Sequence, residues 1–285
     1  MNQQRITGST AVYGVFGDPV AHSLSPVMQN AAFAELNVNG VYLPFHVTLS
    51  QLPAAVQGIR ALGIQGINLT IPLKQAVIPE LDEIVGDSLQ SGSVNTIMNR
   101  NGRLIGTSTD GSGFIQSLRE DGQFDPTGKN ILMLGAGGSA AALLYRLVAS
   151  NVRSITVVNR DPKRVADLRD QVRDRTGFEV ILARLDQLEA LDWSRFQLLI
   201  NTTSVGLHED ASLVQSKLFH ERLLVYDLVY RKGDTRLINE ARQAGCPTLT
   251  GLSLLLYQGA QSFSLWLDRE APIAKMRQVL ETYQA

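Results

Sequence analysis

The chain has 285 residues, enough for one large or two ordinary domains, and its 44% hydrophobic and 19% charged residues are typical of globular proteins. With 26 basic and 27 acidic side chains, the net charge is -1 and no short basic cluster occurs, so we expect no nucleic acid partner. Residues 1–10 lack a secretory pattern, and no apolar run reaches the about 18 residues of a membrane span. We therefore expect a cytoplasmic protein with no membrane partner.

Short apolar stretches alternate with helical patterns in the first part of the chain. The spacing of apolar residues predicts strands at residues 12–16, 41–46 and 66–71 and helices at residues 26–35 and 52–62. This alternation is typical of a parallel or mixed sheet that helices flank. A polar, turn-forming stretch at residues 119–129 then predicts a domain boundary.

The same alternation restarts after the boundary and predicts a doubly wound domain. Apolar stretches there predict strands at residues 130–134, 154–158, 179–182, 198–201, 224–227 and 248–249, with a helix at residues 139–149. Two further helices are predicted at residues 252–266 and 274–283, and periodicity alone does not place them in space. The single cysteine, Cys246, has no second thiol for a disulfide or a zinc cluster, so we expect it to pack and expect no metal.

A glycine-rich turn follows the strand predicted at residues 130–134. The turn consists of Gly135, Ala136, Gly137, Gly138, Ser139 and Ala140, and a helical run continues from it. Glycines let the backbone turn tightly and approach a pyrophosphate, while a helix N-terminus supplies unpaired N–H groups and a partial positive charge. The order of strand, turn and helix predicts a dinucleotide site, against the alternative of an ordinary tight turn.

The residues after the next strand favour NADP over NAD. An NAD site usually has Asp or Glu here to accept hydrogen bonds from the adenosine ribose hydroxyls. This chain instead has Asn159 and Arg160, followed by Lys163 and Arg164, and a guanidinium can pair with a 2'-phosphate through a forked bond. Asp161 has two interpretations: it starts the next helix, or its charge weakens phosphate binding.

A dinucleotide-dependent enzyme that reduces a ketone needs, besides the cofactor, a titratable proton donor beside the reacting oxygen. Four polar segments stand between the apolar stretches of the chain, at residues 22–26, 68–74, 93–96 and 106–111. Three of them directly follow an apolar strand or its first turn, where open α/β sheets bind their ligands. None of these segments is a general catalytic motif by itself.

Taken together, these motifs give the chain a resemblance to the shikimate dehydrogenase (shikimate/quinate dehydrogenase) family over nearly its full length. The similar segments are residues 13–33, 68–74, 93–96, 106–114, 135–140, 159–164, 201–206, 225–230 and 250–263, in the family's order and spacing. The resemblance implies the reversible, NADPH-dependent reduction of 3-dehydroshikimate to shikimate, in chorismate and aromatic amino acid biosynthesis. It also implies two α/β domains, with a mixed sheet in the substrate domain and a Rossmann-like, doubly wound NADP-binding domain. The substrate domain is expected at residues 1–113 plus 250–285, and the NADP-binding domain at residues 114–249. We expect the protein to be a monomer or a homodimer.

The resemblance further assigns the residues that carry the chemistry. Lys74 and Asp110 match the catalytic pair, although either residue alone would be read as a solvated surface charge. The substrate ligands that it implies are Ser23, Ser25, Asn68, Thr70, Asn95, Tyr230 and Gln258. The cofactor contacts that it implies, besides the glycine turn, are Asn159, Arg160, Arg164, Thr203, Leu228, Gly251 and Leu254. Ser25 also fits the N-cap of the first helix, and His22 is expected to hold the serine loop.

The chain departs from the family pattern at four positions. The family often has His at Leu73, Arg at Ala141, Asn at Ser108 and Met at Leu254. The missing arginine at Ala141 removes one possible phosphate contact and so bears on cofactor affinity. Leucine at position 254 keeps the volume and the apolar character of methionine.

Three alternative functions compete with this interpretation. A quinate or quinate/shikimate dehydrogenase would use NAD or both cofactors, and Asn159 with Arg160 argues against it. A folate-linked methylene dehydrogenase is disfavoured because the serine loop and the amide ligands suit a polyol. A non-catalytic dinucleotide-binding regulator would be expected to lack Lys74 or Asp110, and both are present.

Overall fold

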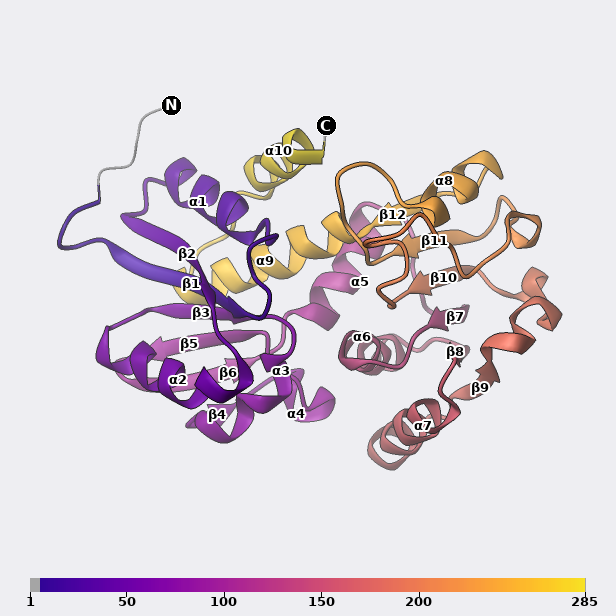
Figure 1. Cartoon of the computed structure of the whole chain (residues 1–285), viewed down its shortest axis with the longest axis horizontal. Coiled ribbons are helices and arrows are strands. Elements are labelled where there is room, and N and C mark those ends of the chain that lie inside the picture. Colours follow the sequence, from indigo (N-terminus) through magenta and orange to yellow (C-terminus); the bar gives the residue numbers. More distant parts are fainter. Residues whose placement is uncertain (1–5, 285) are drawn as a thin grey trace. The chain divides into compact units, whose positions relative to one another are not determined.

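The computed structural model describes residues 6–284 and divides into two compact units. The first unit consists of the described residues up to Gly113 together with Leu255–Tyr283, and the second contains Phe114–Leu254. Both units are α/β structures (Figure 1), which confirms the predicted fold class. No helix within residues 6–284 is long and apolar enough to cross a membrane.

The first unit is built on a mixed sheet with the strand order β2-β1-β3-β5-β6-β4. Its strands are β1 (Ala11–Gly17), β2 (Gly40–His46), β3 (Gly66–Leu69), β4 (Glu83–Ile84), β5 (Thr96–Arg100) and β6 (Arg103–Thr107). Strand β1 pairs in parallel with β2 and β3, whereas β5 runs antiparallel to both β3 and β6. The predicted mixed sheet is therefore confirmed.

The hairpin of β5 and β6 is an element that apolar spacing did not predict. Asn101 and Gly102 join the two strands and have φ angles of 55° and 91°, so both residues are left-handed. Two such residues match the right-handed twist of the flanking strands in a two-residue hairpin turn. The Asn-Gly dipeptide between two short apolar runs was a sequence signal for this hairpin.

Helices cover both faces of the first sheet, because alternate residues of each strand point to opposite sides. On one face, α2 buries Leu52, Val56 and Ile59 in a cluster that includes Ile67 of β3. On the other face, aromatic rings from β1, α1 and α9 lie within about 5 to 6 Å of one another, as between Tyr13 and Trp266 at 5.3 Å. The helices of this unit are α1 (Ser25–Glu35), α2 (Leu52–Ala61), α3 (Leu73–Ala76), α4 (Ser88–Ser91), most of α9 (Gly251–Leu267) and α10 (Ile273–Gln284), with 3-10 turns at Leu49–Gln51 and Ile78–Glu80.

The second unit contains a parallel sheet with the strand order β12-β11-β10-β7-β8-β9. Its strands are β7 (Asn130–Leu134), β8 (Ser154–Asn159), β9 (Ile181–Arg184), β10 (Leu198–Asn201), β11 (Leu224–Asp227) and β12 (Thr248–Thr250). Every pairing in this sheet is parallel, and the direction of the strand order reverses between β7 and β10. Ligands of doubly wound folds bind at the carboxyl ends of the strands beside such a reversal.

Two apolar clusters lie on the two faces of this sheet. Ile131 and Met133 of β7 belong to one cluster, and Leu132 and Leu134 belong to the other. Cys246 is 5% exposed within the second cluster, which confirms its packing role. The helices of this unit are most of α5 (Asp110–Glu120), α6 (Gly138–Ala149), α7 (Pro162–Thr176) and α8 (Arg236–Gln243), with 3-10 turns at Leu185–Ala190, Trp193–Arg195 and Ser216–Leu218.

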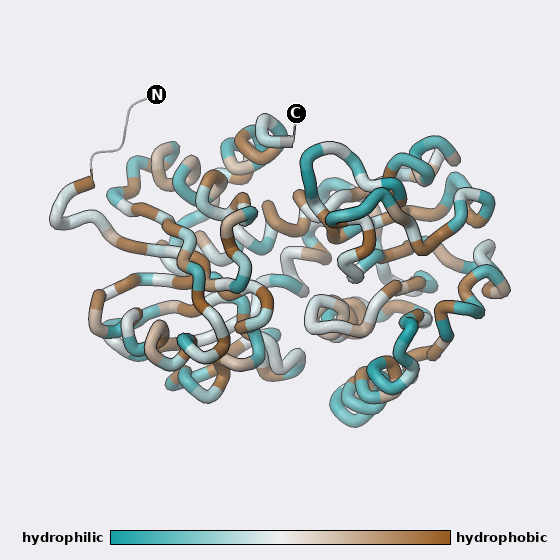
Figure 2. Tube along the Cα trace, in the orientation of Figure 1, coloured by the Kyte–Doolittle hydropathy of each residue, from teal (hydrophilic) through white to brown (hydrophobic). Residues whose placement is uncertain are grey.

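Hydropathy follows this layering in both units. Figure 2 shows hydrophobic residues along the central strands, whereas α7 is largely hydrophilic. Helix α7 nevertheless buries Val165, Leu168 and Val172, which recur at helical spacing on one face. The outer face of α7 is thus left to charged residues.

The close contact between Gly66 and Trp266 predicts that a larger residue at position 66 destabilises the protein. A Cβ atom on Gly66 would collide with the indole of Trp266, which is 5% exposed and donates from Nε1 to the Ile97 carbonyl at 3.0 Å. The indole cannot shift without losing this bond, so Gly66→Ala should lower the free energy of unfolding by about 1 to 3 kcal/mol. Urea denaturation followed by circular dichroism measures the change.

A matched control for this variant is Gly58→Ala in α2, where a Cβ would meet no atom within 4 Å. Alanine there should be neutral or should stabilise the protein by about 0.4 to 1 kcal/mol. Equal stability of both variants would show that the indole does not constrain position 66.

Candidate active site

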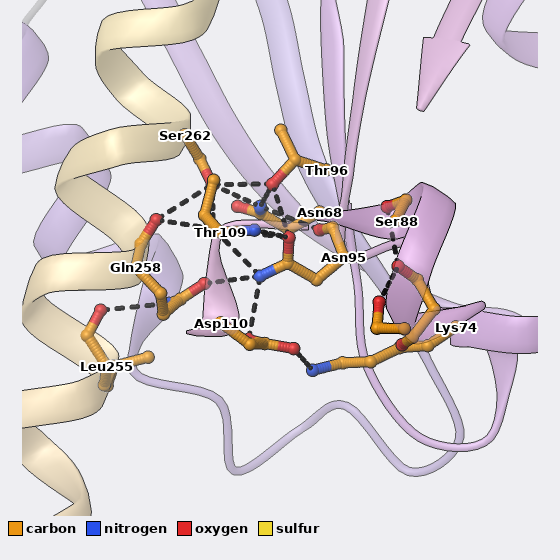
Figure 3. A network of polar contacts seen from close by, with 12 residues as sticks. Asn68, Lys74, Ser88, Asn95, Thr96, Thr109, Asp110, Leu255, Gln258 and Ser262 are labelled. Atoms are coloured by element: carbon orange, nitrogen blue, oxygen red, sulfur yellow. Dashed lines mark hydrogen bonds and ion pairs between the residues drawn. The ribbon is translucent and has the colours of Figure 1, made fainter. Parts of the chain in front are cut away.

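An ion pair between Lys74 and Asp110 lies in the first unit (Figure 3). The Lys74 Nζ is 2.6 Å from Asp110 Oδ2, although the two residues are 36 positions apart in the sequence. Lys74 lies in the short helix α3, which follows β3, and Asp110 is the first residue of α5, which follows β6. Their side chains are 25% and 11% exposed, so the pair is reachable from solvent and yet partly desolvated.

The geometry of this pair suits proton transfer. An ammonium group has three N–H donors, and the bond to Asp110 uses one of them, so Lys74 can also donate to an oxygen of a bound molecule. The carboxylate of Asp110 lies in the first turn of α5, where the helix dipole favours a negative charge. The two groups together can therefore hold and move one proton at a reacting oxygen.

Asn95 fixes the second oxygen of Asp110. Its Nδ2 donates to Asp110 Oδ1 at 2.8 Å, and its Oδ1 accepts from the Thr109 amide at 2.8 Å. The residue is only 1% exposed, and Nδ2 is also 3.1 Å from Gln258 Oε1. Asn95 therefore orients the carboxylate in this structure, and its predicted contact with a substrate hydroxyl stays a prediction.

Asn68 is the centre of a buried network that adjoins the ion pair through Asn95, whose carbonyl accepts from Asn68 Nδ2 at 3.0 Å. Its Oδ1 accepts from the Tyr42 hydroxyl at 2.8 Å, and its Nδ2 is 3.2 Å from Thr96 Oγ1 and 3.0 Å from Ser262 Oγ. Thr96 and Ser262 have no exposed surface. Tyr42, Thr96 and Ser262 belong to this network although they were not predicted as site residues. Ser262 lies four residues after Gln258 on α9, and this helical spacing was a usable signal.

Gln258 reaches the network from α9. Its Oε1 accepts from Asn95, its Nε2 donates to the Leu255 carbonyl at 2.9 Å, and its own carbonyl accepts from Thr109 Oγ1 at 2.9 Å. A Cβ on Gly113 would lie 2.6 Å from the Gln258 backbone nitrogen, so glycine permits this close approach of α5 and α9. Gln258 is half-buried and keeps one side open.

The serine loop lies before α1 and differs from expectation in two ways. Ser25 is not the N-cap: Leu24 holds that position, no side chain caps the helix, and the Ser25 amide donates to Ser23 Oγ at 3.3 Å. The helix begins at Ser25, one residue earlier than predicted, and Pro26 lies in its first turn. His22 is exposed, and no side-chain bond from it to another described residue holds the loop.

Two further positions of the first unit lie close to these groups in the sequence: Thr70, a predicted substrate ligand, and Ser108, a departure from the family pattern. Thr70 follows β3 and is half-buried, and glycine at position 17 leaves room for its methyl group. Ser108, at the position where the family often has Asn, is 5% exposed, and its Oγ has no partner among the described residues.

The glycine turn of the second unit opens α6. Gly135 has a φ of 109°, and a Cβ there would collide with Thr202 Oγ1, so this position requires glycine. A Cβ on Gly137 or Gly138 would meet no atom within 4 Å, and residues 137–139 are exposed. Helix α6 begins at Gly138 without a side-chain cap, so its first N–H groups can bind an anion such as a pyrophosphate.

The end of β8 carries the residues predicted for the adenosine ribose. Asp161 is the N-cap of α7 and accepts from the Lys163 amide at 3.0 Å, which confirms the helix-start interpretation. Its second oxygen is 3.5 Å from Arg164 Nε. Arg160 is exposed, and within residues 6–284 its side chain has no hydrogen bond or ion pair. Its guanidinium is therefore available to a phosphate.

The remaining predicted cofactor contacts lie at the same edge of the second sheet. Thr203, Leu228 and Gly251 follow β10, β11 and β12, and Leu254 packs on the edge of an apolar cluster. Tyr230 belongs to this unit, unlike the other predicted substrate ligands, and burial raises the pKa of its hydroxyl.

Comparisons with known proteins agree with this arrangement. Family models match the shikimate dehydrogenase substrate binding domain at residues 15–97, shikimate / quinate 5-dehydrogenase at residues 119–205 and the shikimate 5'-dehydrogenase C-terminal domain at residues 251–281. The chain is 40% identical to the shikimate dehydrogenase (NADP(+)) of Methanothermobacter thermautotrophicus, over 97% of this chain and 98% of that protein. It is 43% identical to the enzyme of the same name from Pyrococcus furiosus, over 96% of each chain.

A solved structure gives the same result. The crystal structure of a shikimate dehydrogenase in complex with NADP+ superposes with a TM-score of 0.92 at 34% identity, covering 99% of this chain and 98% of that one. The chain therefore belongs to the shikimate dehydrogenase family.

Proposed function

We propose that this protein is an NADP-dependent shikimate dehydrogenase, which reduces 3-dehydroshikimate to shikimate reversibly in aromatic amino acid (chorismate) biosynthesis. The observation that carries the proposal is the 2.6 Å pair of Lys74 and Asp110, oriented by Asn95. Family membership and the NADP(+)-dependent activity named for its relatives support the same function. A cytoplasmic location and a monomeric or homodimeric state stay predictions from the sequence.

The two units divide the work in this proposal. Residues 1–113 with 250–285 form the substrate-binding and catalytic domain, and residues 114–249 form the cofactor domain. The polar network with Lys74 and Asp110 supports the first assignment. The glycine turn at the reversal of a parallel sheet supports the second.

The substrate is a small ring with one carboxylate and several hydroxyls, and the first unit offers groups of matching chemistry. The hydroxyl groups of Ser23 and Ser25 are donors for the carboxylate. Thr70 and Gln258 are half-buried and can reach ring hydroxyls, with Asn68 and Asn95 behind them. The additional carboxylate or ring contact proposed for Tyr230 comes from the second unit.

Lys74 is the proton donor in the proposed reduction. Its ammonium gives a proton to the carbonyl oxygen as a hydride reaches the carbonyl carbon, so that the C=O group becomes CH–OH and Lys74 is left neutral. Asp110 accepts a hydrogen bond from Nζ and holds it at the reacting oxygen, and Lys74 regains its proton from solvent. In the oxidation of shikimate the neutral lysine accepts the hydroxyl proton.

The second unit fits a dinucleotide with a 2'-phosphate. NADPH, when bound, supplies the hydride. The exposed first turn of α6 would hold the pyrophosphate, and Arg160, with Asn159 and Arg164 beside it, would hold the 2'-phosphate. The other predicted cofactor contacts, Thr203, Leu228, Gly251 and Leu254, follow β10, β11 and β12, on the side of β7 opposite to β8 and Arg160, so we propose them for the nicotinamide half. Alanine at position 141 leaves this phosphate site with one arginine fewer than the family often has.

Initial rates with shikimate and with quinate, each against NADP+ and NAD+, test the proposed function. We expect the highest kcat/KM for shikimate with NADP+. A higher value for quinate, or for NAD+, would instead favour the quinate/shikimate dehydrogenase alternative.

Replacement of Lys74 by alanine should lower kcat by roughly 10² or more and change KM little, because the variant loses a positioned proton donor. Steady-state kinetics with shikimate and NADP+ measure both constants. Lys217→Ala is the control, since Lys217 is an exposed residue that pairs with Glu189 in the second unit. Near-normal turnover of the Lys74 variant would remove this residue from the chemistry.

Replacement of Arg160 by alanine should weaken NADPH by about 1.5 to 3 kcal/mol, the scale of a charged hydrogen bond, and should leave NADH nearly unchanged. Dissociation constants from cofactor fluorescence measure both ligands. Arg153→Ala is the control, because Arg153 is exposed and precedes β8, at the opposite end of the strand. An equal loss for NADPH and NADH would contradict the phosphate role.

A further inference from the structure

A buried carboxylate in the second unit has no role in the mechanism above. Asp227 is the last residue of β11 and has no exposed surface. Its Oδ1 accepts from Asn201 Nδ2 at 2.8 Å and from the Val229 amide at 3.1 Å, and its Oδ2 accepts from Thr235 Oγ1 at 2.6 Å. All these donors are neutral groups.

Burial of this carboxylate lowers the stability of the folded protein. An ionised carboxylate loses its hydration in a buried site, and neutral donors replace that hydration only in part. Burial accordingly raises the pKa of Asp227, against the opposing effects of its hydrogen bonds and of the positive charge of Arg231. An apolar residue at the end of β11 would avoid this cost, so the carboxylate needs a reason beyond packing.

The hydrogen bonds of Asp227 join two loops at the carboxyl edge of the sheet. On one side, the amide of Asn201 bridges Asp227 and Thr203, because its Oδ1 accepts from the Thr203 amide at 3.1 Å and from Thr203 Oγ1 at 2.7 Å. On the other side, Thr235 is the N-cap of α8 and accepts from the Ile238 amide at 3.3 Å. The loop after β10 is thereby tied to the loop after β11.

Two more of the proposed nicotinamide contacts depend on the same loops. The Leu228 amide donates to the Asn201 carbonyl at 3.0 Å, and the Gly251 amide donates to the Val229 carbonyl at 3.4 Å. A Cβ on Gly251 would collide with the Leu228 carbonyl, so the start of α9 lies directly against the loop after β11. The first turn of α6 and Arg160 follow β7 and β8, and the hydrogen bonds of Asp227 do not reach them.

We propose that Asp227 is a positioning residue for the nicotinamide half of the cofactor: it fixes Thr203, Leu228 and Gly251 through Asn201 and the loop after β11. The inference rests on the proposed NADP-dependent function. It separates the cofactor site into two parts, since the adenosine half depends on α6 and Arg160 and the nicotinamide half depends on Asp227.

The test compares two ligands, NADPH and adenosine 2',5'-bisphosphate, which lacks the nicotinamide half. Asp227→Asn keeps the shape of the side chain, but its amide would donate toward Thr235 Oγ1 and leave the Thr235 hydroxyl without its acceptor. We expect this variant to bind NADPH about 10-fold more weakly, the scale of a hydrogen bond to a charged group, with less than about 2-fold change for the bisphosphate. Calorimetric titration of the full-length protein measures both constants.

Arg160→Ala is the matched comparison, because it should weaken both ligands. Thr235→Val removes a single donor and keeps the carboxylate, so it gives the same selective loss in a milder form if Asp227→Asn does not fold. Unchanged NADPH binding in the folded variants, or equal weakening of both ligands, would overturn the positioning role. Failure of the wild-type protein to bind NADPH or to oxidise shikimate would instead overturn the proposed function.

Discussion

The hydrogen bonds that hold both oxygens of Asp110 are the constraint on which the first unit depends. Its Oδ2 accepts from Lys74, which follows β3, and its Oδ1 accepts from Asn95, which precedes β5. Since Asp110 itself follows β6, these three segments must converge at one point. The sheet achieves this because β5 lies between β3 and β6 and runs antiparallel to both. The start of β5 then lies at the same edge as the ends of its two neighbours. A parallel β5 would carry Asn95 to the opposite edge, and the mixed sheet is therefore a requirement of the site.

The second unit brings its functional residues together by the opposite means. All of its strands are parallel, so the turns after β7, β8, β10, β11 and β12 share one edge without any reversal of chain direction. Each turn then meets a different local requirement. Gly135 is needed for a left-handed backbone beside Thr202, whereas Gly137 and Gly138 leave space that a side chain would fill. The buried Asp227 adds hydrogen bonds that link two of these turns. Burial of its carboxylate costs desolvation free energy, which an apolar residue at this position would not lose.

Local sequence signals predicted the elements that apolar spacing defines, and they were weakest where polar residues are buried. The β5–β6 hairpin was not predicted because Asn99 interrupts its apolar pattern. The side chain of Asn99 is nevertheless buried, and it donates to the Ile64 carbonyl at 2.8 Å. The convergence of Lys74 and Asp110 was inferred from matching family motifs, since nothing local relates two residues 36 positions apart. Tyr42 could not be assigned to the network from the sequence alone, because its partner Asn68 is 26 positions away. Ser262 is 194 positions from Asn68, and only its helical spacing from Gln258 connected it with the site. Tyr42 of β2 reaches Asn68 across β1, which lies between β2 and β3, and Ser262 reaches it from α9.

Asp161 shows how one acidic residue can remain beside a site for a 2'-phosphate. The N-terminus of α7 needs an acceptor for its unpaired N–H groups, and Asp161 supplies one to the Lys163 amide. Its other oxygen lies 3.5 Å from Arg164, so part of its charge is offset locally. This pair is exposed and contributes little to stability, which leaves Arg164 able to turn toward a phosphate. The neighbouring Arg160 has no such partner among the described residues, and the proposed preference for NADP therefore rests on Arg160 more than on the net charge of the segment.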